Sequence, residues 1–285
     1  MKELVVISGK GGTGKTCLSS SLALLASNPV ICDCDVEAPN LHILLQPEVQ
    51  QTREFSASQQ AHLDEEQCIF CGLCIDLCRF GAIQDFQVSN LDCEGCGLCS
   101  RICPVEAISM EEHCSGEWYS STTRYGPMFH ARLGIGEQNS GKLVALLRQQ
   151  AREAAQANGR ELVITDGPPG TGCATIAAIS GCQLAVIVTE PTLSAIHDLK
   201  RVIELCRHFK VKCGVIINKA DLNPVKARDI KEYCAEEEVP VWGEVPFRED
   251  LVEAVNNCQL PVQYSAALAT LMQGIWKEVE VSLDD

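Results

Sequence analysis

Two groups of residues in this chain have the types and the spacing that metal and phosphate chemistry require. Cysteines occur in two runs, 68–78 and 93–103, and each run reads Cys-x2-Cys-x2-Cys-x3-Cys. That spacing is used to ligate iron–sulfur clusters through thiolates. Residues 8–16 read Ser-Gly-Lys-Gly-Gly-Thr-Gly-Lys-Thr and match the glycine-rich loop that binds nucleotide phosphates. The sequence therefore predicts a protein that joins nucleotide chemistry to electron or cluster chemistry.

The glycine-rich loop lies between an apolar run and a helical pattern, which is the context that this motif needs. Residues 4–7 read Leu-Val-Val-Ile, and leucines follow the loop within residues 18–25. Backbone N–H groups would face phosphate oxygens, Lys15 would supply a positive charge for the outer phosphates, and Thr16 would offer its hydroxyl to magnesium. The expected ATP-binding residues of the loop are Gly9, Lys10, Gly11, Gly12, Thr13, Gly14, Lys15, Thr16 and Cys17.

The first lysine of the loop makes the motif more specific. Residues 10–16, Lys-Gly-Gly-Thr-Gly-Lys-Thr, resemble the deviant Walker A motif of the MinD, ParA, Mrp and nitrogenase iron protein superfamily. The resemblance implies a homodimer in which Lys10 reaches the nucleotide phosphates of the facing subunit and neutralises charge during phosphoryl transfer, as an arginine finger does. Lys10 and Lys15 are therefore expected to be catalytic. A solvated loop lysine is the alternative for Lys10.

Two acidic segments that follow apolar strands resemble the switches of the same superfamily. Residues 33–40 read Asp-Cys-Asp-Val-Glu-Ala-Pro-Asn, and residues 166–172 read Asp-Gly-Pro-Pro-Gly-Thr-Gly. The resemblance implies that Asp35 is a third catalytic residue, which orients the attacking water. An acidic residue at a strand end can also be a simple helix cap. The expected magnesium site consists of Thr16, Asp33, Asp35 and Asp166.

A polar tetrapeptide after a later strand is a candidate site for the nucleotide base. Residues 218–221 read Asn-Lys-Ala-Asp and match the pattern by which GTPases read guanine. The superfamily resemblance favours adenine, with Asn218 at the base edge and Pro246 in the wall of the pocket. Guanine and a plain polar turn both stay open from these four residues alone.

The two cysteine runs repeat each other at an offset of 25 residues, which resembles the internal repeat of a bacterial two-cluster ferredoxin. In that family the fourth cysteine of each run ligates the other cluster. The second run ends in the usual Cys-Pro pair, whereas Arg79 replaces the proline after the first run. The resemblance implies one 4Fe–4S cluster on Cys68, Cys71, Cys74 and Cys103, and a second on Cys78, Cys93, Cys96 and Cys99.

Zinc and disulfides explain these cysteines less well. Typical zinc modules separate their cysteine pairs by roughly 12 to 20 residues, and these runs leave no such gap. Disulfides belong to oxidising compartments. The chain instead starts Met-Lys-Glu without an apolar signal segment, and its nucleotide motif favours a cytoplasmic, oxygen-poor location.

Cys173 lies seven residues after Asp166, just beyond the second switch. The nitrogenase iron protein has a cysteine at the matching place, which helps to bridge a cluster across its dimer. One such cysteine per subunit supplies only two ligands, and Cys114 is the only nearby candidate to add more. A third cluster that bridges a dimer, a redox or docking role, and simple packing all stay open for Cys173.

Charge separates the cysteine segment from the rest of the chain. The formal net charge is −15, and residues 61–112 carry ten acidic and two basic side chains. Such a segment should repel nucleic acid and favour a redox or iron–sulfur acceptor protein with a basic surface. The helical pattern at 268–279 resembles the membrane-seeking tail of MinD, but residues 277–285 of this tail carry one lysine among four acidic residues. A core-packing helix is therefore favoured over a membrane helix.

These pieces predict an α/β protein with a mostly parallel sheet that is covered by helices on both faces. We expect a P-loop ATPase domain of the SIMIBI class at 1–60 and 113–285, with a small α+β ferredoxin-like domain inserted at 61–112. Residues 118–133 match no generic motif. They could cross a dimer face, cover the clusters or serve as a connecting segment.

Over nearly its whole length the chain resembles MinD-superfamily ATPases with an inserted ferredoxin domain, a group often labelled as cobyrinic acid a,c-diamide synthase. Amidation of a corrinoid is not expected, because no glutaminase Cys-His-Glu domain is recognisable. The resemblance implies ATP, magnesium and two 4Fe–4S clusters as cofactors, and hydrolysis of ATP to ADP and phosphate. The partner in the dimer would be a second copy or a related ATPase paralogue.

Three functions fit this set of motifs. The favoured one is a nucleotide-dependent dimer that gates electron transfer through the two clusters to a partner. The second is an Mrp-like iron–sulfur carrier or assembly ATPase. Against it, the sequence has no Cys-x2-Cys pair near its C-terminal end such as Mrp-type carriers use. The third is a MinD- or ParA-like spatial regulator or scaffold with redox-sensing clusters.

Overall fold

The computed structural model of the chain describes residues 1–134, 136–137 and 139–284. Positions 135, 138 and 285 of the expected ATPase range lie outside the described residues. The chain divides into two compact units. The nucleotide unit consists of Met1–Thr52, Trp118–Arg132 and Ser140–Asp285, and the cysteine unit consists of Arg53–Glu117 and Leu133–Asn139. The expected insert, 61–112, lies inside the cysteine unit.

One sheet provides the frame of the nucleotide unit. Its strands are β1 (Lys2–Ser8), β2 (Val30–Asp33), β3 (Glu48–Leu63), β6 (Ile108–Thr123), β7 (Gly126–Leu133), β8 (Leu162–Pro169), β9 (Leu184–Thr189), β10 (Lys212–Asn218) and β11 (Val241–Val245). The strand order is β11-β10-β9-β1-β8-β2-β7-β6-β3. All neighbours from β11 to β7 pair in parallel. The expected mostly parallel α/β sheet is confirmed.

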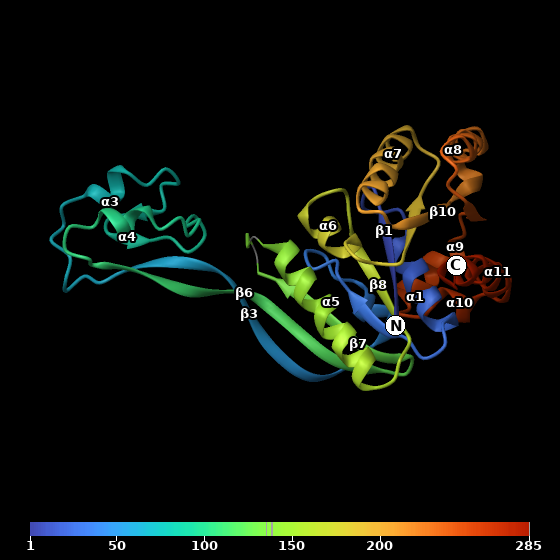
Figure 1. Ribbon diagram of the computed structural model, residues 1–285, viewed down its shortest axis with the longest axis horizontal. Helices are drawn as coiled ribbons and strands as arrows, with labels where there is room; N and C mark the ends of the chain where they lie inside the picture. The colour runs from blue at the N-terminus through green and yellow to red at the C-terminus, as the bar shows by residue number, and fades with distance from the viewer. Residues whose placement is uncertain (135, 138, 285) are drawn as a thin grey trace. The chain divides into compact units, whose positions relative to one another are not determined.

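Helices alternate with strands through most of the nucleotide unit, which ends in three successive helices. The helices of this unit are α1 (Lys15–Leu25), α2 (Leu41–Leu45), α5 (Ser140–Ala157), α6 (Cys173–Ile179), α7 (Leu193–His208), η1 (Ala220–Leu222), α8 (Pro224–Glu236), α9 (Glu249–Asn256), α10 (Pro261–Tyr264) and α11 (Ala266–Asp284). Figure 1 shows α1, α10 and α11 together on one side of this unit and α5 on the other. No helix of the described chain combines the length and apolar composition that crossing a membrane would need.

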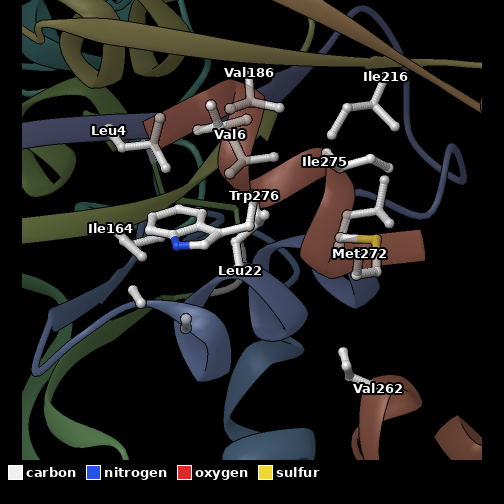
Figure 2. Packing of buried hydrophobic residues seen from close by; sticks show 14 of the residues in the cluster. Leu4, Val6, Leu22, Ile164, Val186, Ile216, Val262, Met272, Ile275 and Trp276 are labelled. Atoms are coloured by element: carbon white, nitrogen blue, oxygen red, sulfur yellow. The ribbon is translucent and has the colours of Figure 1, made fainter. Parts of the chain in front are cut away.

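The main core lies between the sheet and the helices α1 and α11. Leu4 and Val6 of β1 pack with Leu22 of α1 and with Met272 and Trp276 of α11 (Figure 2). Side chains alternate between the two faces of a strand, so Glu3 of β1 points to the opposite face. Helix α11 is thus a core helix, because most of its large apolar side chains are buried in the main core, although Val281 is exposed.

Residues 118–133, which match no generic motif, extend the sheet. They form the end of β6 and the whole of β7. β7 pairs in parallel with β2, with Ile31 opposite Met128. The middle of β7 is buried, as expected for a strand inside a sheet.

The cysteine unit has little regular structure beyond the parts of β3 and β6 that it contains. Its other elements are α3 (Leu73–Asp76), β4 (Ile83–Gln84), β5 (Gln87–Val88) and α4 (Leu98–Ile102). β4 and β5 form an antiparallel pair. A small core contains Leu63, Ile83 and Ile108, and six of the eight motif cysteines pack in it or against it. Short helices and turns therefore position most of the thiols.

Candidate functional site

The glycine-rich loop joins the buried strand β1 to helix α1. Gly12 and Gly14 adopt φ values of 79° and 85°, which favour glycine. A Cβ atom on Gly14 would lie 2.3 Å from Nδ2 of Asn218, so the backbone approaches that side chain closely. The loop lines a cavity together with Thr16, Asp35 and Glu37. This is the place where the sequence predicts the nucleotide phosphates.

Lys15 is the buried cation of this cavity. Its Nζ lies 2.9 Å from Oδ1 of Asp166 and 3.8 Å from Oδ2 of Asp35. Burial disfavours the charged amine, but the carboxylates of Asp166, Asp35 and Asp33 outweigh burial and raise the pKa of Lys15. The hydroxyl of Ser19 donates to the same Asp166 oxygen at 2.8 Å. Lys15 therefore stays protonated in the lining of the cavity.

The three switch aspartates lie at different depths. Asp35 lines the cavity beside Thr16, whereas Asp33 and Asp166 are almost fully buried behind it. Oδ1 of Asp33 accepts from the N–H of Asp35 at 3.1 Å, and Oδ2 accepts from the N–H of Leu41 at 3.2 Å. Burial, with Asp166 nearby, raises the pKa of Asp33 to about 8. In this structure Asp33 shapes the first switch, and its expected role near magnesium stays a prediction.

The donor set of the cavity fits a nucleotide with magnesium. Oδ2 of Asp166 and Oγ1 of Thr13 are buried and have no hydrogen-bond partner among the described residues. Buried polar atoms normally have a partner. The hydroxyl of Thr16 and the carboxylate of Asp35 are oxygen ligands of the kind that magnesium prefers. Thr16, Asp35 and Asp166 are thus the residues that would hold the ion, directly or through water.

Lys10 binds within its own chain. Its Nζ lies 2.7 Å from Oε1 of Glu190 and donates to the hydroxyls of Thr192 and Ser194 at 3.2 Å each. Lys219 binds the other oxygen of Glu190 at 2.9 Å. Burial opposes the charge of Glu190, but the two lysines hold its pKa below the ordinary value. Sequence reasoning missed Glu190, since no motif marks it.

An apolar cavity of about 250 Å³ adjoins the loop and suits a nucleotide base. Cys17, Asn218, Pro246 and Phe247 are among the residues that line it. The amide of Asn218 donates to the carbonyl of Thr13 at 2.7 Å. Asn218 and Pro246 thus line one cavity beside the loop, and their role at the base stays a prediction.

The fourth residue of the tetrapeptide has a structural role. Oδ1 of Asp221 accepts from the N–H of Phe247 at 2.5 Å, which holds the wall of the base cavity. This contact uses one oxygen of the Asp221 carboxylate, and the preference for adenine over guanine stays a prediction.

The eight motif cysteines line two cavities of the cysteine unit. The first cavity is lined by Cys68, Cys71, Cys74 and Cys103. The second is lined by Cys78, Cys93, Cys96 and Cys99, and Cys74 reaches it too. Each cavity thus combines three cysteines of one run with the fourth cysteine of the other. These are the two ligand sets that the ferredoxin resemblance implies.

Backbone N–H groups point at the thiols. Phe70 donates to Sγ of Cys68 at 3.3 Å, and Ala107 donates to Sγ of Cys103 at 3.2 Å. Such donors stabilise thiolates and tune the reduction potential of a bound cluster. Within the described residues, no three cysteine, histidine or acidic side chains converge where a single metal ion could bind. Each of the two cavities has at least four thiols in its lining and is a candidate cluster site, and the 4Fe–4S clusters themselves stay a prediction.

Cys173 is exposed at the start of α6. A Cβ atom on Gly141 of α5 would lie 3.2–3.3 Å from Cys173, so the two helix starts pack closely. Cys114 is exposed in the cysteine unit. A bridging cluster, a redox role and packing stay predictions for Cys173.

The chain is similar to other proteins over most of its length. Residues 4–262 match the family model CbiA, described as the CobQ/CobB/MinD/ParA nucleotide binding domain. A protein of Methanocaldococcus jannaschii, "Uncharacterized protein MJ0578", is 37% identical over 258 residues, which is 90% of this chain and 88% of that protein. A "Cytosolic Fe-S cluster assembly factor Nubp1 homolog" of Drosophila ananassae is 24% identical over 154 residues, 47% of this chain and 49% of that protein.

Solved structures share the fold. The cell division ATPase MinD of Pyrococcus furiosus has a TM-score of 0.59 at 15% identity and covers 98% of both chains. McdA of Cyanothece in complex with ATP has a TM-score of 0.58 at 17% identity and covers 100% of this chain and 96% of that one. At this identity the likeness shows the fold alone. By its family match over residues 4–262, the chain belongs to the CobQ/CobB/MinD/ParA nucleotide binding domain family.

Proposed function

We propose that the chain is an ATP-hydrolysing iron–sulfur protein whose nucleotide-dependent dimer gates electron transfer through two 4Fe–4S clusters to a partner. The observation that carries this proposal is the sharing of cysteines between two cavities, each lined by at least four motif thiols of one chain. One chain can therefore hold both clusters without ligands from a partner. When bound, such clusters supply one-electron transfer at low potential.

The nucleotide cavity supports ATP hydrolysis by phosphoryl transfer to water. Asp35 borders the cavity. In this proposal it orients a water whose oxygen forms a bond to the γ-phosphorus while the bond to the bridging β–γ oxygen breaks. Lys15 stands at the loop and faces the negative charge that develops on the phosphates. Thr16 and Asp166 would hold magnesium with Asp35.

In this proposal Lys10 has two positions, one paired with Glu190 of its own chain and one at the phosphates of a facing subunit. In the observed state Lys10 binds Glu190, Thr192 and Ser194 of its own chain. To reach the phosphates of a facing subunit, Lys10 must leave Glu190. Glu190 then keeps Lys219 as its partner, so its charge is not left unpaired. Nucleotide binding can thus be coupled to dimer closure through an exchange of ion-pair partners.

The test is a potentiometric EPR titration of both clusters under anaerobic conditions. It compares the nucleotide-free protein with the protein saturated with magnesium and a non-hydrolysable ATP analogue. We expect the potentials to shift by tens of millivolts, because closure changes solvent exposure and nearby charge. The shift should be absent in Lys10→Ala. Equal potentials in both states, with nucleotide bound, would count against thermodynamic gating.

A second candidate function is cluster assembly, and one observation favours it. About half of the chain matches proteins named as cytosolic Fe-S cluster assembly factors. An assembly ATPase should transfer iron and sulfide to an apo acceptor protein in an ATP-dependent way. The four thiols of each cavity hold their cluster within one chain, which favours retention. Transfer to an apo ferredoxin within minutes would favour assembly over electron transfer.

A further inference from the structure

Exposed apolar side chains gather in the cysteine unit. Among the described residues, sixteen large hydrophobic residues are exposed, and seven of them fall within residues 69–98. This stretch is about a tenth of the chain, so exposure is concentrated there. Clustered exposed hydrophobic residues mark interaction sites, whereas scattered ones are ordinary.

Three of these residues form an apolar centre at the first cysteine cavity. Ile69 and Leu73 line that cavity together with Cys71, which is itself exposed. Phe70 lies between them in sequence and is 57% exposed. Phe70 has φ 55°, which is unfavourable for a bulky residue, and its ring packs edge-on against Phe86 at 4.9 Å. The fold thus holds an aromatic ring in water next to a predicted cluster ligand.

Carboxylates border this apolar centre on the sequence segments that build the cavity. Asp64, Glu65 and Glu66 precede Cys68, Asp76 ends α3, and Glu106 follows Cys103. All five are exposed. Within the described part of the chain, no ion pair joins any of them to a basic side chain. We call these five residues the acidic rim.

The second cavity differs in charge. Its lining includes Arg79 as well as Glu94, and Arg101 lies in the last turn of α4, two residues after Cys99. The segments that build the first cavity, 64–76 and 103–108, contain no basic residue. The two cavities therefore present different surfaces, although their cysteine motifs are alike.

We propose that the apolar centre with its acidic rim is the docking surface for the redox partner, and that electrons cross at the first cavity. The partner is a protein with a ring of basic side chains around an apolar patch. Opposite charges steer the encounter and the apolar contact holds the complex. This inference rests on the proposed function, whose partner it describes.

Binding of a defined probe tests this surface. The probe is a basic c-type cytochrome with zinc in place of iron, which docks but accepts no electron in the dark. The cluster-loaded full chain should bind it, and Asp64→Lys/Glu66→Lys should weaken binding at least tenfold at low salt. The difference should shrink at high salt, because salt screens exposed charges. Asp92→Lys/Glu94→Lys at the second cavity makes the same change in net charge and should alter binding less than threefold.

The contribution of the apolar contact is tested by comparing Ile69→Ser at the first cavity with Leu98→Ser at the second. Ile69→Ser should weaken probe binding at every salt concentration, and Leu98→Ser should not. Iron content and EPR spectra check that every variant keeps both clusters. Equal losses in the two charge variants, or no binding by the wild type, would overturn the docking surface. If the reduction potentials of the clusters did not change on ATP binding, the gating function would be refuted. The difference in probe binding between the two charge variants would still be expected.

Discussion

At the scale of single residues, the nucleotide site depends on how burial and charge are balanced. Lys15 is buried but stays charged chiefly because it pairs with the carboxylate of Asp166. Lys10 is half-exposed and bonded to Glu190. The two lysines of one loop are therefore in different electrostatic settings, which suits a fixed phosphate contact for Lys15 and a mobile one for Lys10.

Lys15→Ala and Lys10→Ala should separate binding from catalysis. Lys15→Ala removes the buried cation and leaves Asp166 without its ion pair, so ATP affinity should fall at least tenfold. Lys10→Ala should change ATP affinity only a few-fold but lower kcat by about 10³-fold, as loss of an arginine finger does. Nucleotide titration and steady-state phosphate release measure the two effects. Normal kcat in Lys10→Ala would contradict a catalytic role for this lysine.

His130 should make the protein sensitive to acid. The ring is buried, stacks on Tyr119, and pairs with the hydroxyl of Ser121 at 2.9 Å. Burial, helped by His42, lowers the pKa of His130 to about 4. Because the folded state lowers this pKa, the neutral ring contributes stability at pH values above the pKa of unfolded histidine, near 6.5, and this stability is lost as pH falls toward 4. The free energy of unfolding of the wild type should therefore fall by about 2–3 kcal/mol relative to that of His130→Phe over this range.

Denaturant unfolding at pH 7, 5.5 and 4.5 measures the acid effect of His130. Ser121→Ala is the control, because it removes a hydrogen bond at every pH but keeps the titrating ring. It should be offset from wild type by a constant amount above pH 6.5 and still lose stability on acidification. Parallel pH profiles of wild type and His130→Phe would exclude His130 as the cause.

At the scale of elements, strand β1 serves both faces of the sheet. Leu4 and Val6 face α1 and α11 in the main core. Glu3, on the other face, accepts from Nε of Arg148 in α5 at 2.6 Å and pairs with Arg152. Strand β1 thus contributes to an apolar layer on one face and to a buried ion pair on the other. The glycine-rich loop begins where this strand ends.

Glu3→Ala should be strongly destabilising. It would leave the guanidinium of Arg148 buried without its carboxylate, which costs about 3–5 kcal/mol. Lys2→Ala is the matched control on the same strand, because Lys2 pairs with Asp284 in the exposed setting where pairs contribute about 0–1 kcal/mol. Urea unfolding of both variants measures the difference. Similar losses in the two would show that α5 is not anchored through Glu3.

At the scale of the whole molecule, the chain separates nucleotide chemistry from thiol chemistry. Every residue of the phosphate and base cavities belongs to the nucleotide unit, and all eight motif cysteines belong to the cysteine unit. Strands β3 and β6 run through both units and link them covalently. Loss of a motif cysteine in the cysteine unit should therefore leave ATP binding by the nucleotide unit largely unchanged.

Cys103→Ser tests this separation and the sharing of cysteines between runs. Because Cys103 lines the first cavity, its loss should perturb the cluster of Cys68, Cys71 and Cys74 and lower the iron content by up to roughly half. ATP affinity should stay within about twofold of wild type. Iron analysis, EPR and nucleotide titration give the readouts. Cys78→Ser is the counterpart for the second cavity, and identical EPR changes in both variants would argue against two independent sites.

The sequence alone predicted the class of fold, which the structure confirms, and a nucleotide and iron–sulfur chemistry whose cluster part stays a prediction. The glycines of the loop, the spacing of the cysteines and the alternation of apolar strands with helices act over a few residues, so local pattern suffices to predict them. Contacts between distant segments could be seen only in the folded structure. Lys10 pairs with Glu190, and Asp33 is buried. Asp221 accepts from the N–H of Phe247, and residues 118–133 form strands of the sheet. These contacts depend on strand register and packing between segments far apart in the chain, and no local pattern encodes either.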